Sequence, residues 1–142
     1  MTINKYSKKE NNTADCIQSL KVRGYKIVAT LPDEKYPTLE ELKFDKKVAL
    51  IFGTEAEGLT EGAIQSADEY VRIKMYGFTE SFNISVSVAL CLHYLSTKLR
   101  ESNIDWRMSE EEKLETSITW VKNIVKRSDL LEKEFYKNII PK

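Results

Sequence analysis

Residues 46–52, KKVALIF, contain an uninterrupted apolar run that stops at Gly53. A strand without alternation of apolar and polar residues is typical of a parallel sheet, in which helices cover both faces. The polar loop TEAEG follows at once, and Thr60 can begin a helix. The run therefore predicts an α/β fold in which a loop at the carboxyl end of a parallel strand leads into a helix.

The rest of the chain supplies the other layers of such a fold. The helix at 81–100 is apolar nearly all round at its start, so we expect it to be buried on more than one side. We expect strands at 25–30 and 69–75, a helical turn at 38–42, and helices at 13–23, 60–67, 81–100, from Ser109 and from Ser128.

Composition limits the classes of protein that fit this chain. A length of 142 residues suits one compact domain, and 42% apolar and 31% charged residues are ordinary for a globular protein. No apolar run approaches the roughly 20 residues of a membrane span. Cys16 and Cys91 lie far apart, which predicts neither a zinc site nor a disulfide framework. The net charge of zero argues neither for nor against nucleic acid.

Three polar or glycine-bearing loops follow the apolar strands, after Thr30, Phe52 and Met75. The carboxyl ends of parallel strands meet at one edge of a sheet, so these loops should converge into a ligand site. The loop FGTEAEG is neither GxGxxG nor a P-loop. Its Glu55 and Glu57 would repel a phosphate but suit a ligand with hydroxyl or ammonium groups. The alternative is an ordinary strand-to-helix turn with solvated carboxylates.

The third loop, MYGFTESFNIS, leads into the helix expected at 81–100. Ser81 or Asn83 can cap that helix, and capping alone would explain either residue. Capping explains less well why Ser81, Asn83 and Ser85 alternate in a helix start that is otherwise very apolar. Buried polar side chains need hydrogen-bond partners, so we expect a bound ligand to supply them.

Two segments, IFGTEAEGLT and RIKMYGFTESFNISVSVALCLHYL, resemble the second and third signature motifs of the SpoU/TrmH branch of the SPOUT superfamily. These proteins are RNA ribose 2'-O-methyltransferases. The segment from Ile104 resembles the helical extension of the tRNA (guanosine-2'-O)-methyltransferase subgroup. The resemblance implies a C-terminal trefoil knot, S-adenosylmethionine (AdoMet) as cofactor, and methyl transfer to a ribose 2'-hydroxyl, with a tRNA guanosine as the first candidate. The knot rests on the family alone, since knots are rare.

The family's site residues carry over by position. Its AdoMet contacts, made mostly through backbone groups, fall at Thr30, Gly53, Ile73 and Phe82, with Met75 beside them. Its polar active-site positions fall at Glu55, Ser81 and Asn83. Phe82 stands where leucine is usual, a change that backbone-mediated contacts should tolerate.

The family's first motif, an Asn followed by an Arg on an early helix, has no counterpart before Tyr25, and Arg23 is in the wrong place to replace it. The resemblance therefore implies the C-terminal portion of the fold, incomplete at the N-terminus. That arginine is thought to activate the ribose hydroxyl, so the activity of these 142 residues alone stays open. The alternatives are a catalytically incompetent cofactor- or RNA-binding dimerisation module and an unrelated nucleotide-binding α/β domain.

The expected organisation is a flexible segment at 1–12, a SPOUT methyltransferase domain at 13–104 and a helical extension at 105–142. The helix at 81–100 has more apolar surface than one side of a three-strand sheet can cover. Because family members dimerise through this region, we expect a homodimer with this helix at the interface. RNA, tRNA in particular, is the expected partner, in the cytoplasm and without a membrane. No metal is expected, because a sulfonium already provides a good leaving group.

Overall fold

The computed structural model describes residues 5–6, 12–43, 45–79 and 81–139. The chain divides into two compact units, Met1–Asn103 and Ile104–Lys142. The expected flexibility of residues 1–12 falls almost wholly outside the described residues, which include only 5, 6 and 12 of that segment. In the described part, no helix is both long and apolar enough to cross a membrane.

The first unit is built on a parallel sheet of three strands in the order β2-β1-β3. Strand β1 (Tyr25–Thr30) lies between β2 (Lys47–Ile51) and β3 (Glu69–Val71) and pairs in parallel with both. Four consecutive residues of β1 are buried, as the predicted covering of both sheet faces requires. The predicted α/β class with a parallel sheet is confirmed.

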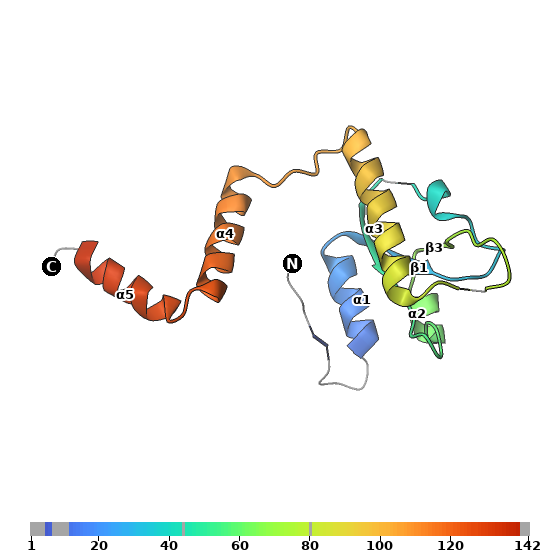
Figure 1. Ribbon diagram of the computed structural model, residues 1–142, viewed down its shortest axis with the longest axis horizontal. Coiled ribbons are helices and arrows are strands. Elements are labelled where there is room, and N and C mark those ends of the chain that lie inside the picture. The colour runs from blue at the N-terminus through green and yellow to red at the C-terminus, as the bar shows by residue number, and fades with distance from the viewer. Residues whose placement is uncertain (1–4, 7–11, 44, 80, 140–142) are drawn as a thin grey trace. The chain divides into compact units, whose positions relative to one another are not determined.

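Helices cover the two faces of this sheet (Figure 1). Helix α3 (Ile84–Glu101) and the 3-10 turn η1 (Leu39–Glu41) lie on one face, and α1 (Asn12–Val22) and α2 (Glu61–Gln65) lie on the other. Val28 points into the core beneath α3, whereas its neighbour Ile27 points into the core beneath α1 and α2. This alternation along β1 divides the hydrophobic interior into two layers.

Strand β3 is shorter than the predicted strand at 69–75 and ends at Val71. Its neighbour β1 stops at Thr30, so the chain beyond Val71 has no strand to pair with. Arg72 instead forms two backbone hydrogen bonds with the segment that leads into η1. Its N–H donates to Pro37 O at 2.9 Å, and its carbonyl accepts from Leu39 N at 2.9 Å. The predicted length of this strand was wrong, because the number of residues that pair in a sheet depends on the length of the partner strand.

A buried lysine joins the amino ends of the strands. Lys26 in β1 is only 8% exposed, and its Nζ donates to Asp45 at 2.8 Å, Glu69 at 2.9 Å and the Lys43 carbonyl at 2.9 Å. Burial by itself lowers the pKa of Lys26, but the bonds to the two carboxylates outweigh it and raise the pKa above its ordinary value. Lys26 therefore stays charged, at the edge of the sheet opposite the loops that follow the strands.

The second unit consists of helices α4 (Glu110–Ile124) and α5 (Ser128–Ile139). Helix α4 begins with the predicted capping box: Ser109 Oγ accepts from Glu112 N at 3.1 Å, and Glu112 Oε2 accepts from Ser109 N at 2.8 Å. Lys122 and Glu132 form an ion pair at 2.7 Å between the two helices. Neither helix has a buried residue among those described.

Candidate functional site

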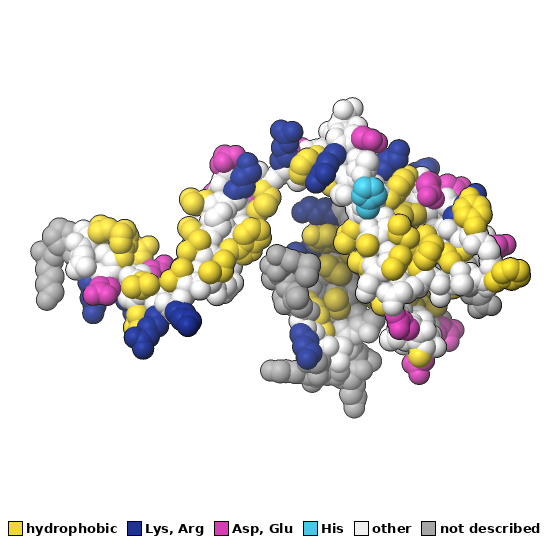
Figure 2. All heavy atoms as spheres, viewed as in Figure 1, with side chains coloured by type: hydrophobic (Ala, Val, Ile, Leu, Met, Phe, Trp, Pro, Cys, Tyr) yellow, Lys and Arg dark blue, Asp and Glu magenta, His cyan; other side chains and the backbone are white. Residues whose placement is uncertain are grey.

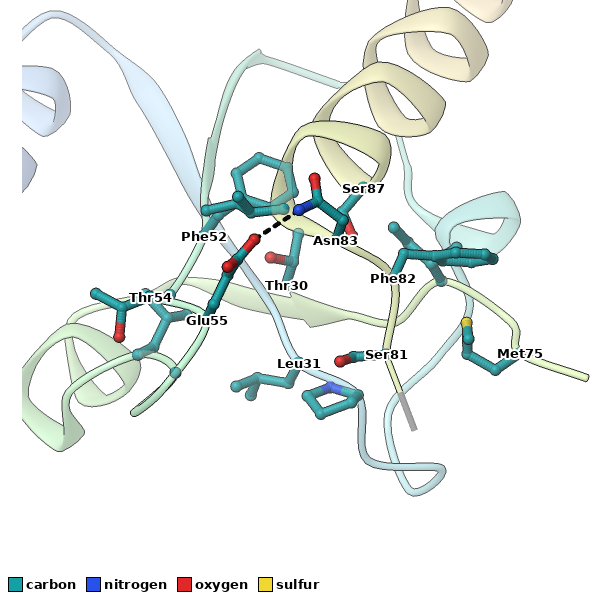
Figure 3. A pocket seen from close by; sticks show the side chains of 16 residues that line it. Thr30, Leu31, Phe52, Thr54, Glu55, Met75, Ser81, Phe82, Asn83 and Ser87 are labelled. Carbon is teal, nitrogen blue, oxygen red and sulfur yellow. Dashed lines mark hydrogen bonds between the residues drawn. The ribbon is translucent and has the colours of Figure 1, made fainter. Parts of the chain in front are cut away.

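A pocket of about 560 Å³ opens at the carboxyl ends of the strands, a volume within the range of small-molecule sites. Its walls come from the loops after β1, β2 and β3 and from the first turn of α3 (Figure 3). The eight residues that the resemblance placed in the site all line this pocket: Thr30, Gly53, Glu55, Ile73, Met75, Ser81, Phe82 and Asn83. The structure therefore brings together residues that are up to 53 positions apart in the sequence.

The loop after β2 folds back on itself. Thr54 and Gly58 exchange two backbone hydrogen bonds of 3.0 Å, and Thr54 Oγ1 accepts from Glu57 N at 3.1 Å. A Cβ atom on Gly53 would lie 2.1 Å from the carbonyl carbon of Gly58 and 2.3 Å from Leu59 N. Glycine is thus required at position 53 by the close approach of this loop's own backbone, a reason that the sequence did not reveal.

Asn83 uses both ends of its amide at the entrance of α3. Its Oδ1 accepts from Ser85 N at 2.9 Å, which makes Asn83 the N-cap of the helix. Its Nδ2 donates to Glu55 Oε1 at 2.7 Å, and the two side chains point toward one another in Figure 3. Capping therefore explains the contact of Asn83 Oδ1. The contact of its Nδ2 instead joins the loop after β3 to the loop after β2.

Ser81 lies before the helix, lines the pocket and does not cap α3. The expectation that the polar residues at this helix start are buried is wrong, since Ser81, Asn83 and Ser85 are all exposed. Ser85 does not line the pocket. Water can form hydrogen bonds with these exposed side chains, so a bound ligand is not needed as their hydrogen-bond partner.

Helix α3 is also less buried than predicted. Cys91 is its one buried residue among those described, whereas Val86, Leu90 and Leu92 are 44%, 41% and 59% exposed. Figure 2 shows hydrophobic side chains gathered on the surface over this helix. Burial, and then the Glu40 carboxylate, raise the pKa of Cys91 to about 11, so its thiol stays protonated and is no nucleophile.

The pocket has an acidic and apolar lining. Glu55 is the one charged side chain among the described residues that line it, and Glu57 does not line it. Sequence reasoning missed several lining residues, of which Leu31 directly follows the predicted Thr30 and Ser87 lies one helical turn after Asn83. Helical spacing from Asn83 could have found Ser87.

Arg23 lies at the other end of the sheet. It precedes β1, and its guanidinium stacks over the Tyr25 ring at 5.4 Å. Thr30, which lines the pocket, ends the same strand, about 17 Å further on at the usual rise per residue. This geometry agrees with the expectation that Arg23 cannot act at the pocket of its own chain.

The chain is similar to known RNA-modifying proteins. Residues 3–93 match the model of the SpoU rRNA Methylase family. A Borreliella burgdorferi tRNA (guanosine(18)-2'-O)-methyltransferase is 41% identical over 132 residues, which cover 93% of this chain and 59% of that protein. A protein of the same name from Aquifex aeolicus is 29% identical over 109 residues, which cover 75% of this chain and 52% of that protein.

Solved structures give the same result. The crystal structure of the A. aeolicus TrmH/SpoU tRNA modifying enzyme matches with a TM-score of 0.69 and 27% identity, over 80% of this chain and 59% of that chain. An AdoMet-bound rRNA methyltransferase from Sinorhizobium meliloti matches with a TM-score of 0.56 and 25% identity, over 61% of this chain and 33% of that chain. This chain spans little more than half the length of the first two relatives. It belongs to the SpoU rRNA methylase family.

Proposed function

We propose that the pocket binds AdoMet and that the protein transfers its methyl group to a ribose 2'-hydroxyl of RNA, with a tRNA guanosine as the target. The observation that carries this proposal is the convergence of all eight family-derived positions on one pocket at the carboxyl edge of a parallel sheet. Relatives named as tRNA guanosine 2'-O-methyltransferases and the AdoMet-bound structural neighbour support it.

The lining of the pocket fits AdoMet. Ile73, Met75 and Phe82 offer apolar surface for an adenine ring, and the loops after β1 and β2 offer backbone groups. AdoMet carries positive charge on its sulfonium and its amino group, which the Glu55 carboxylate complements. A phosphate-bearing cofactor would instead lie near the Glu55 carboxylate, and the described lining residues include no basic side chain to balance the phosphate charge.

When bound, AdoMet would supply a methyl group on a sulfonium, which is a good leaving group. The ribose oxygen that takes the methyl group would give up its proton, for which Glu55 is the one carboxylate among the described lining residues. The residues of this chain would position the ribose. Asn83 holds the Glu55 carboxylate through its 2.7 Å hydrogen bond, and Glu55 has further lone pairs for the 2'-hydroxyl. Ser81, exposed in the same pocket, can hydrogen-bond a second ribose oxygen. No metal is needed for this displacement.

The proposed working form is a homodimer in the cytoplasm, where tRNA is modified. Its support is the exposed apolar surface of α3, where Val86 and Leu90, four positions apart, share one face. Burying such surface between two copies is the usual basis of a stable dimer. A C-terminal trefoil knot in residues 13–104 and a helical extension from residue 105 are further parts of the proposal, supported by the likeness to the A. aeolicus enzyme.

The cofactor proposal is tested by titrating AdoMet into the full chain in a calorimeter. Ser87→Trp places an indole in the pocket and should weaken binding at least tenfold. Ser85→Trp is the matched control, because Ser85 lies on the same helix, is exposed and does not line the pocket. Absence of saturable binding, or equal binding by the two variants, would overturn the assignment.

The activity is tested with AdoMet labelled on the methyl group and unmodified tRNA, under single-turnover conditions with protein in excess. Methylation of a 2'-hydroxyl blocks alkaline cleavage of the next phosphodiester bond, so label should appear in alkali-resistant dinucleotides that begin with guanosine. Label on a base would contradict the proposed reaction. Tight binding of AdoMet and tRNA without any transfer would favour a binding module instead.

A further inference from the structure

A second, smaller cavity of about 400 Å³ adjoins the first. The two share the side chains of Pro32, Ile73 and Met75, so a molecule that fills the second cavity lies next to the proposed methyl-transfer site. Its other walls are the loop after β1, which contributes Asp33 and Glu34, and the segment after Met75, which contributes Phe78. Arg72 also lines it.

Phe78 lines this cavity, and no part of the described chain covers its side chain. Its side chain is fully exposed, at 108% of the reference area, and Tyr76, two residues earlier, is 81% exposed. Gly77 between them has φ +107°, a left-handed conformation that lets the chain turn there. An exposed aromatic ring at the rim of a polar cavity is suited to stacking on a nucleobase.

The two carboxylates of the cavity are not equivalent. Asp33 accepts from the Lys35 backbone at 3.0 Å and pairs with Lys35 Nζ at 2.7 Å; the side-chain bond is the main cause of the lowered pKa of Asp33. Glu34 is exposed and has no hydrogen-bond or ion-pair partner among the described residues. Glu34 is therefore the carboxylate available to a ligand.

Basic groups lie beside the ring and the carboxylate. Arg72 donates from Nε to the Tyr36 carbonyl at 3.0 Å, which anchors its guanidinium at the cavity wall. Lys74 Nζ lies 5.3 Å from the centre of the Tyr76 ring. Cations interleaved with exposed aromatic rings provide contacts for both the phosphates and the bases of single-stranded RNA.

We infer that the second cavity holds the base of the target nucleotide and selects guanine, with Phe78 stacking on the base and Glu34 accepting from its Watson–Crick edge. Guanine presents two adjacent N–H donors, N1–H and the 2-amino group, to a single carboxylate. Adenine lacks the N1–H, and inosine lacks the amino group. Arg72 would contact the adjoining phosphate. This inference rests on the proposed function, because a base in this cavity places its ribose toward Ser81 and Asn83 in the first pocket.

The inference is tested by fluorescence anisotropy with the full chain, saturating AdoMet and short labelled oligouridylates that carry one guanosine, inosine or adenosine. The wild type should bind the guanosine oligomer about tenfold more tightly than the inosine oligomer, since a bidentate pair has about that discriminating power. Glu34→Gln should bring this ratio close to one. Phe78→Ala should weaken all three oligomers about tenfold, and Phe78→Tyr should restore binding.

Matched controls are Phe135→Ala and Glu134→Gln, exposed residues of α5 that should leave all affinities unchanged. AdoMet affinity, measured by calorimetry, should be the same in every variant, because neither Glu34 nor Phe78 lines the first pocket. If AdoMet binds but Glu34→Gln keeps the guanosine preference, or Phe78→Ala binds RNA normally, the inference is overturned while the cofactor site stands. If Phe78→Ala changes only the monomer–dimer equilibrium, the ring belongs to a protein interface.

Discussion

Asn83 joins a structural and a proposed chemical role in one side chain, and substitutions can separate the two. Asn83→Ser keeps an N-cap of similar strength but loses the donor to Glu55, whereas Asn83→Ala loses both. We expect Asn83→Ala to lower the free energy of unfolding by about 1 kcal/mol and Asn83→Ser to leave it nearly unchanged.

Both Asn83 variants should slow single-turnover methyl transfer by a similar factor, about tenfold to a hundredfold, because the Glu55 carboxylate loses the group that holds it in place, and misplacing a group of the site by about 1 Å can cost that much in rate. Urea unfolding and the labelled-methyl assay measure the two effects. If Asn83→Ser reacted at the wild-type rate, the link to Glu55 would have no part in the reaction.

Asp68 should make stability depend on pH. Its carboxylate accepts from Ile27 N at 2.7 Å and from Lys21 Nζ at 2.8 Å. Partial burial by itself raises the pKa of Asp68, but these two hydrogen bonds outweigh it and lower the pKa below its ordinary value. Since the pKa is lower in the folded protein, the contribution of Asp68 is complete above the unfolded-state value, about 4, and is lost as pH falls through the folded value.

Asp68→Asn removes this titration. The difference in unfolding free energy between wild type and variant should therefore be largest at neutral pH and should shrink below about pH 4. Urea unfolding between pH 3 and 7 measures it, with Asp129→Asn on α5 as an exposed control. A difference that stays constant over this range would show that the Asp68 carboxylate titrates alike in both states.

At the scale of elements, the loop after β2 is shaped by its own backbone. Gly53→Ala would force a Cβ to within 2.1 Å of Gly58, so the loop must move away from its position. We expect a loss of about 1–3 kcal/mol in unfolding free energy, as for overpacked interiors, together with weaker AdoMet binding.

Gly62→Ala is the matched control for Gly53→Ala. Gly62 lies in α2 with no atom within 4 Å of an added Cβ, so alanine should stabilise the protein by up to about 1 kcal/mol. Urea unfolding and calorimetry compare the two variants. Wild-type stability of Gly53→Ala would mean that the loop can relax without cost.

At the scale of the whole molecule, the exposed face of α3 should mediate self-association. Leu90→Glu places a charge on the face that Leu90 shares with Val86, and burying that charge between copies would be costly. We expect a dimer for the wild type and a monomer for Leu90→Glu, by light scattering at micromolar concentration. Leu131→Glu on α5, another exposed leucine, is the control for the general effect of the substitution. A monomeric wild type would remove the proposed interface.

The sequence by itself determined the α/β class, the positions of the helices and strands within a few residues apart from the end of β3, and the caps of α2 and α4 at Thr60 and Ser109. For α3 it left Ser81 and Asn83 as alternatives, of which the structure has Asn83. These features depend on local chemistry: apolar runs, turn glycines and polar side chains at helix starts. It also indicated the loops of the site, because the ends of parallel strands converge.

Only the tertiary structure decided how far pairing extends and which surfaces are covered. Strand β3 ends at Val71 because β1 offers it no further partner, and Gly53 is required because Gly58 returns against it. Helix α3 has an apolar composition on several sides, yet within one chain the sheet covers only the side with Cys91. The hydrogen bond between Asn83 and Glu55 likewise joins residues 28 positions apart. Such contacts depend on distances across the folded chain, which no local pattern of residues specifies.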